Sequence, residues 1–101
     1  MKDITLSLKQ GQVVISKKGR DKGGLFVVLN VATEHDGEYA WISDGLVRCI
    51  DKPKKKKAKH IQPTKYINYS LEYKLVNSVT INNLDVRDAI KAYGQFNVKE
   101  V

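Results

Sequence analysis

The chain has 101 residues, with 18 lysines and arginines against 11 aspartates and glutamates, so its formal net charge at pH 7 is +7. This length and a hydrophobic share of 42% predict one soluble globular domain. The longest apolar candidate, residues 25–31, contains Asn30 and is far shorter than the roughly 18 residues of a membrane span. The first residues lack a signal-peptide pattern and Cys49 is the single cysteine, so we expect a cytoplasmic protein without a disulfide, a metal site or a cofactor.

The positive charge is concentrated in one part of the chain. Residues 9–65 hold 13 basic and six acidic side chains, a balance of +7, whereas the segments before and after them are neutral. A local excess of this size favours a polyanionic partner. A chance asymmetry of solvated charges is the simpler alternative.

Short apolar segments separated by turn residues predict a mostly β region over residues 1–65. Strands are expected over 12–16, 25–31, 39–43, 46–50 and 60–63, with turns at Asp36-Gly37 and Asp44-Gly45. Residues 25–31 are apolar on both faces, with Leu25, Val27, Leu29 and Val31 on one of them, which places this strand centrally between a core and the C-terminal helix. Five such strands are what a small SH3-like barrel needs, because closure hides strand edges.

Residues 66–101 have a different pattern and are expected to form a helical extension. Ile67, Leu71 and Leu75 repeat every four residues and favour a helix over 70–77, although residues 69–75 also fit strand alternation.

A second helix is indicated over 84–93. Asn82 or Asn83 is its expected cap, and Gly94 is its expected end. Since a helix of this length is not stable alone, its apolar stripe must dock on the barrel or on a partner. The stripe consists of Val86, Ala89, Ile90 and Tyr93.

Two basic elements are the candidate binding residues. The first is the loop 17–24, in which three glycines let a phosphate chain approach closely and place Gly23 and Gly24 at expected positive φ. The second is the lysine-rich run 52–59, which Pro53 and charge repulsion are expected to keep out of the sheet. A plain β-turn and a solvated loop are the simpler interpretations.

Residues 11–29 resemble the KOW motif of ribosomal and transcription-elongation proteins, with Gly23 after Arg20-Asp21-Lys22 at the position of its central glycine. Together with Ser43-Asp44-Gly45, the lysine run and the segment 59–64, the chain resembles the archaeal and eukaryotic fourteen-e family of large-subunit ribosomal proteins and their short bacterial KOW relatives. The resemblance covers residues 11–64. It implies an SH3-like KOW barrel that binds RNA.

The expected function is therefore that of an RNA-binding, ribosome-associated protein. It would contact rRNA of the large subunit in a structural or assembly role, be a monomer when free, and contact ribosomal proteins through its C-terminal helix. The alternative is a protein-interaction module of the transcription machinery that contacts RNA polymerase. The expected RNA-binding residues are Lys17, Lys18, Arg20, Lys22, Gly23, Arg48, Lys52, Lys54, Lys55, Lys56, Lys57, Lys59 and His60.

Catalysis is not expected. The two histidines, the single cysteine and the turn aspartates make no evident nucleophile and base set, and the glycine-rich loop lacks the Gly-Lys-Ser/Thr ending of a P-loop.

The aromatic side chains allow two interpretations. We expect Trp41 in the core rather than stacked on a base, while Tyr66 and Tyr69 fit either base stacking or helix packing. Cys49 is expected to be a small buried side chain, and His35 an exposed turn residue.

Overall fold

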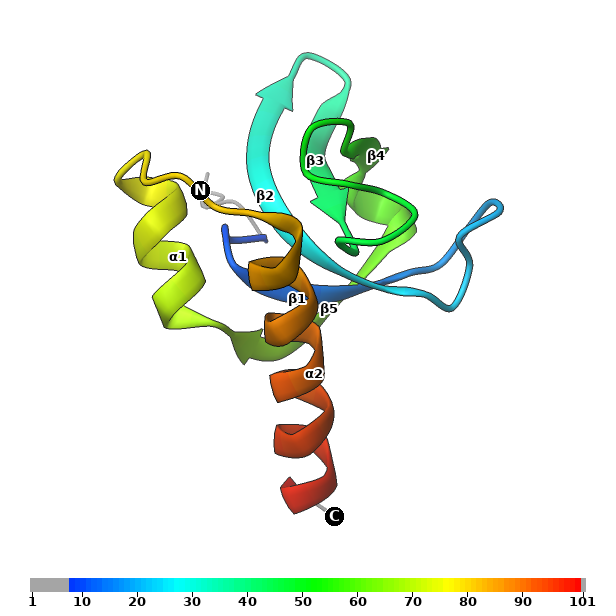
Figure 1. The fold of residues 1–101 in the computed structure, drawn as a ribbon. Coiled ribbons are helices and arrows are strands. Elements are labelled where there is room, and N and C mark those ends of the chain that lie inside the picture. Colours follow the sequence, from blue (N-terminus) through cyan, green and yellow to red (C-terminus); the bar gives the residue numbers. More distant parts are fainter. Residues whose placement is uncertain (1–7, 101) are drawn as a thin grey trace, which may run out of the picture.

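The computed structural model describes residues 8–100, with the side chains of residues 8–96. Its elements are β1 (Gln12–Ser16), β2 (Leu25–Glu34), β3 (Gly37–Ser43), β4 (Lys54–Lys57), the 3-10 helix η1 (Ala58–His60), β5 (Ile61–Ile67), α1 (Tyr69–Val76) and α2 (Asn83–Glu100). The strands form one antiparallel sheet in the order β4-β3-β2-β1-β5, and the helices follow it (Figure 1). The prediction of a mostly β fold with a helical C-terminal part is confirmed.

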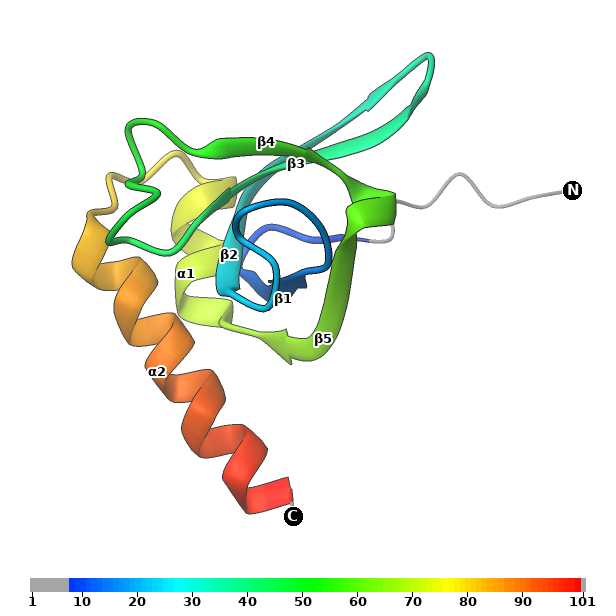
Figure 2. The ribbon, with the colours of Figure 1, turned by 90° about the vertical axis from the view of Figure 1, so that its right-hand side faces the viewer.

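The sheet is open. β4 and β5 are its edges, and no hydrogen-bonded ladder joins them within residues 8–100. η1 forms the corner between these two strands (Figure 2). The closed SH3-like barrel therefore stays a prediction. In this same part of the chain, no helix is both long and apolar enough to cross a membrane.

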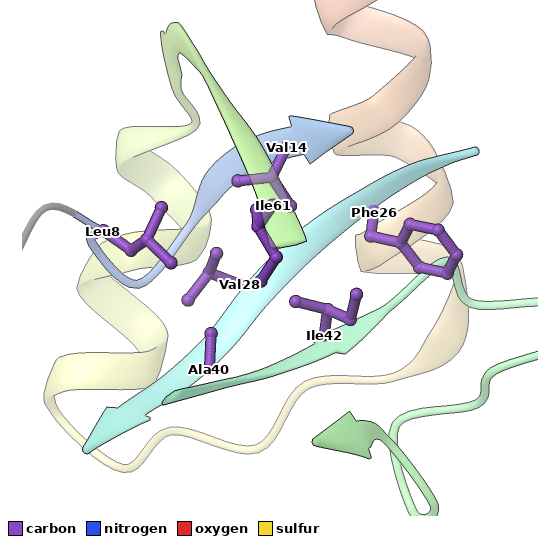
Figure 3. Close-up of a cluster of buried hydrophobic side chains, with 7 residues drawn as sticks. All are labelled: Leu8, Val14, Phe26, Val28, Ala40, Ile42 and Ile61. Atoms are coloured by element: carbon purple, nitrogen blue, oxygen red, sulfur yellow. The ribbon is translucent and has the colours of Figure 1, made fainter. Parts of the chain in front are cut away.

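Hydrophobic side chains of the central strand β2 are buried on both faces of the sheet. The first core cluster lies on one face (Figure 3) and consists of Leu8, Val14, Phe26, Val28, Ala40, Ile42 and Ile61. The second lies between the sheet and the helices and consists of Val13, Val27, Leu71, Val86 and Ala89. The predicted burial of this strand on both faces is confirmed, and the helices dock on the sheet.

A β-bulge changes the alternation along β2. The register with β3 shifts between Val28 and Asn30, so that Val31 pairs with Ala40 and packs against the first core cluster. The expected face with Leu25, Val27, Leu29 and Val31 together is therefore wrong at its last residue. Beyond the bulge, Ala32 pairs with Tyr39 on the face opposite to Val31.

The strand expected over 46–50 is wrong, because local hydrogen bonds hold this segment as a loop. Asp44 Oδ1 accepts from the backbone N–H groups of Leu46 and Arg48, at 2.9 and 2.8 Å. The Ser43 hydroxyl donates to the Arg48 carbonyl oxygen at 2.6 Å. These bonds occupy backbone groups that a strand ladder would need. Cys49 in this loop is half-buried rather than buried.

The fourth strand is instead the lysine run, as β4 pairs with β3 from Ile42 with Lys54 to Tyr39 with Lys57. The expectation that these lysines interrupt the sheet is wrong. Two carboxylates offset their repulsion, since Glu34 lies 2.9 Å from Lys55 Nζ and Asp36 lies 3.4 Å from Lys57 Nζ.

Both predicted helices are present, and their starts are capped by side chains. Asn68 Oδ1 accepts from Leu71 N at 3.0 Å at the start of α1. Asn82 accepts from Asp85 N, and Asp85 accepts from Asn82 N, each at 2.9 Å. This reciprocal pair selects Asn82 over Asn83 as the cap of α2. Asn83 Oδ1 accepts instead from Ile50 N, which ties α2 to the loop 44–53.

The expected end of the second helix at Gly94 is wrong, because α2 continues to Glu100. A glycine inside a helix costs about 1 kcal/mol relative to alanine. Aromatic packing compensates here, since the ring of Tyr66 lies 6.0 Å from Tyr93 and 5.2 Å from Phe96, centroid to centroid. Of the two interpretations offered for Tyr66, helix packing is the one that the structure shows.

Candidate nucleic-acid interface

The loop between β1 and β2 is a tight, exposed basic turn. Gly23 N donates to the Ser16 carbonyl oxygen at 2.7 Å, and Ser16 N donates to that of Gly24 at 3.1 Å. Gly23 has the expected positive φ, +88°. Gly24 does not have the expected positive φ. A larger residue is disfavoured there because its Cβ would lie 3.0 Å from the ring of Phe26. The exposed cations of this loop are Lys17, Lys18, Arg20 and Lys22.

The structure joins this loop to the lysine run. Lys56 Nζ donates to the Lys18 carbonyl oxygen at 2.7 Å. Lys17 N donates to the carbonyl oxygen of His60, at the end of η1, at 2.9 Å. Figure 1 shows the loop extending to the side of the sheet opposite α1. The residues that meet here are named the basic surface: Lys17, Lys18, Arg20, Lys22, Lys56, Lys59 and His60.

The charges of the basic surface are not neutralised within the described part of the chain. None of its six lysine and arginine side chains lies within ion-pair distance of a described acidic side chain. Lys55 and Lys57, by contrast, are paired with Glu34 and Asp36. The basic surface is therefore where an added anion would meet unpaired positive charge.

His60 reports this local positive charge. Desolvation lowers its pKa below the ordinary value of 6.5, and Lys18, Lys59, Lys56 and Lys57 lower it further by repelling the protonated ring. The imidazole is therefore mostly neutral at pH 7.

Arg48 has a structural contact. Its Nη2 donates to Asp21 Oδ2 at 3.2 Å, which connects the loop 44–53 to the basic loop. The guanidinium is already engaged in the free protein, so an RNA phosphate would have to compete with Asp21 for it. Lys52 is exposed and Lys54 is half-buried, and neither forms an ion pair with a described acidic side chain.

The other face of β4 carries two lysines beside two aromatic rings. Lys55 Nζ lies 4.5 Å from the ring centroid of Tyr39 and 5.5 Å from that of Trp41. Lys57 Nζ lies 5.8 Å from the Tyr39 ring. Trp41 is half-buried and belongs to neither core cluster, so its expected place in the core is wrong.

Hydrogen bonding and charge hold this second group of side chains in place. The Tyr39 hydroxyl donates to Asp36 Oδ2 at 2.9 Å, and this bond lowers the pKa of the Asp36 carboxyl and raises that of the tyrosine. The bond from Lys55 to Glu34 raises the lysine pKa. Sequence reasoning missed both carboxylates, although their places beside the hairpin turn 34–37 were a signal.

Within the described residues, no group of three or more histidine, cysteine or acidic side chains is placed to hold a metal ion. Comparison with protein-family models gives no match for the chain, and comparison with curated proteins gives no similar sequence.

Proposed function

We propose that this chain is an RNA-binding, ribosome-associated protein that holds rRNA phosphates on its basic surface, in a structural or assembly role. The single observation that carries the proposal is the bond of Lys56 to the Lys18 carbonyl oxygen, because it brings the two basic elements together. The proposal includes the KOW resemblance and the SH3-like arrangement of the five strands that it implies.

The chemistry of the basic surface favours recognition of the RNA backbone. Lysine offers a point charge to phosphate and carries little information about base identity, whereas Arg20 offers a forked contact. The proposed binding is therefore strongly dependent on salt and weakly dependent on sequence.

The test is sedimentation of the protein with ribosomal subunits through a gradient, with and without RNase. The proposal expects co-sedimentation that RNase abolishes. The double variant Lys18→Glu with Lys56→Glu should no longer co-sediment with the subunits. The control is Lys91→Glu, at an exposed lysine of α2 with the same charge change per site, and it should still co-sediment. Protein that stays in the upper fractions, or a double variant that still co-sediments, overturns the proposal.

A second candidate is the protein-interaction module of the transcription machinery. The docked stripe of α2 is buried against the sheet and does not support it. The observation in its favour is the exposed apolar side of α1, where Tyr69, Tyr73 and Val76 are 70%, 64% and 57% exposed. Co-purification with RNA polymerase that survives RNase would favour this function.

A further inference from the structure

The outer face of β3 and β4 presents aromatic rings in register with lysines. Tyr39 pairs with Lys57 and Trp41 pairs with Lys55 in the antiparallel ladder. Directly paired residues project from the same face of a sheet, so these four side chains form one surface. We name it the aromatic face.

Neither the core nor the helices cover the aromatic face. Ala40 and Ile42, which alternate with the two rings along β3, point into the first core cluster. The helices pack against another part of the sheet, around Val13 and Val27. In Figure 2 the end of the hairpin between β2 and β3 extends away from both helices.

We propose that Tyr39 and Trp41 form a stacking platform for unpaired bases of single-stranded RNA. The inference rests on the proposed function and deepens it, because it assigns the kind of RNA that is bound. Aromatic rings beside cations bind single strands by stacking bases while the cations hold phosphates. Adjacent residues of β4 serve the two roles: Lys56 reaches the basic surface and Lys55 lies on the aromatic face.

Lys55 lies where the proposed platform would hold a nucleotide. Its Nζ lies over both rings and 2.9 Å from Glu34 Oε2. Both contacts are weak at exposed sites. A bound nucleotide replaces both, since its base takes the ring face and its phosphate takes the ammonium group.

The Tyr39 ring is already oriented for stacking. Its hydroxyl is fixed to Asp36 at 2.9 Å, in the turn next to the strand. A ring that is held in place loses less rotational freedom when a base stacks on it.

The test compares three probes on the full chain at low salt: an oligouridine of about ten nucleotides, an abasic ribose-phosphate chain of equal length, and an RNA duplex. Trp41 is the single tryptophan, so intrinsic fluorescence reports directly on this site. We expect the oligouridine to quench Trp41 and to bind at least about fivefold more tightly than the abasic chain.

Variants separate stacking from charge. Tyr39→Leu should remove most of the preference for the oligouridine over the abasic chain. Tyr39→Phe keeps the ring and should keep the preference. Tyr69→Leu, at an exposed tyrosine of α1, is the matched control and should change nothing.

Equal affinity for the oligouridine and the abasic chain, or an unquenched Trp41, overturns the stacking platform and leaves the proposed function standing. This comparison uses the unaltered protein, so it decides the question even where a variant misfolds. If the unaltered protein binds none of the three probes, the proposed function is overturned, and the inference with it.

Discussion

Replacing Lys18 and Lys56 by alanine tests how many phosphates the basic surface holds. Six of its side chains are lysine or arginine without an acidic partner among the described residues. Each single-strand phosphate contact contributes about −0.7 to the slope of log affinity against log salt, so six contacts predict a slope of about −4. Raising the salt from about 50 to 200 mM should then weaken binding by about 300-fold.

The double variant should have a slope of about −2.8, with a loss of only about 50-fold over the same salt range. Fluorescence anisotropy with a labelled single-stranded RNA measures both slopes. Lys74→Ala with Lys91→Ala, two cations of the helices, is the control and should keep the original slope. An unchanged slope in the Lys18 and Lys56 variant, or an equal change in the control, would refute the counting of contacts.

Three further predictions concern His60, the loop 44–53 and the second core cluster. Bound phosphates should raise the pKa of His60, so RNA binding takes up a proton and affinity rises as pH falls from about 7 to 5.5. Gly45→Ala places a Cβ 2.5 Å from the Asn83 carbonyl oxygen, at a residue whose φ is +73°. The substitution should lower the free energy of unfolding, measured in urea, by more than about 1 kcal/mol. Leu71→Ala leaves a cavity between helix and sheet and should cost about 2–5 kcal/mol.

The following measurements check these predictions. NMR titration of His60 with and without RNA should show the rise in its pKa, and a His60 titration that RNA leaves unchanged would contradict the prediction. The stability of the protein without RNA depends on pH in the opposite direction to RNA binding. The lowered folded-state pKa means that the unfolded chain binds more protons, so stability falls as pH drops through 6.5. The control for Leu71→Ala is Leu84→Ala, at a side chain that is 53% exposed. Its free energy of unfolding should stay within about 0.5 kcal/mol of that of the unaltered protein.

Regular patterns of apolar residues were sufficient to predict the parts of the fold that depend on burial. Residues 25–31 are apolar on both faces, and the structure places β2 between two cores. Both helices begin close to their expected starts, because caps such as Asn82 are local signals. The residues of the basic loop were likewise recognisable as a group, since the loop is contiguous in the sequence.

The errors arise where long-range pairing decides the structure. Asp44-Gly45 is a turn, but the Asp44 carboxylate binds the following backbone, which prevents a hairpin. The lysines become a strand because β3 offers an unpaired edge and carboxylates from the neighbouring hairpin. Because the run is a strand, its side chains alternate between two surfaces. Counting charges along the sequence cannot show which lysines belong to which surface.

The position of the lysine run at the edge of the sheet also bears on self-association. An open strand edge is a template for pairing with another chain. Two copies of this protein that met along β4 would oppose four lysines with four lysines, and the opposite edge, β5, contains Pro63, which has no N–H to donate. Repulsion between these lysines therefore also opposes pairing of the β4 edge with a second copy of the chain. RNA would cover this edge at the same time as it neutralises the lysines that protect it.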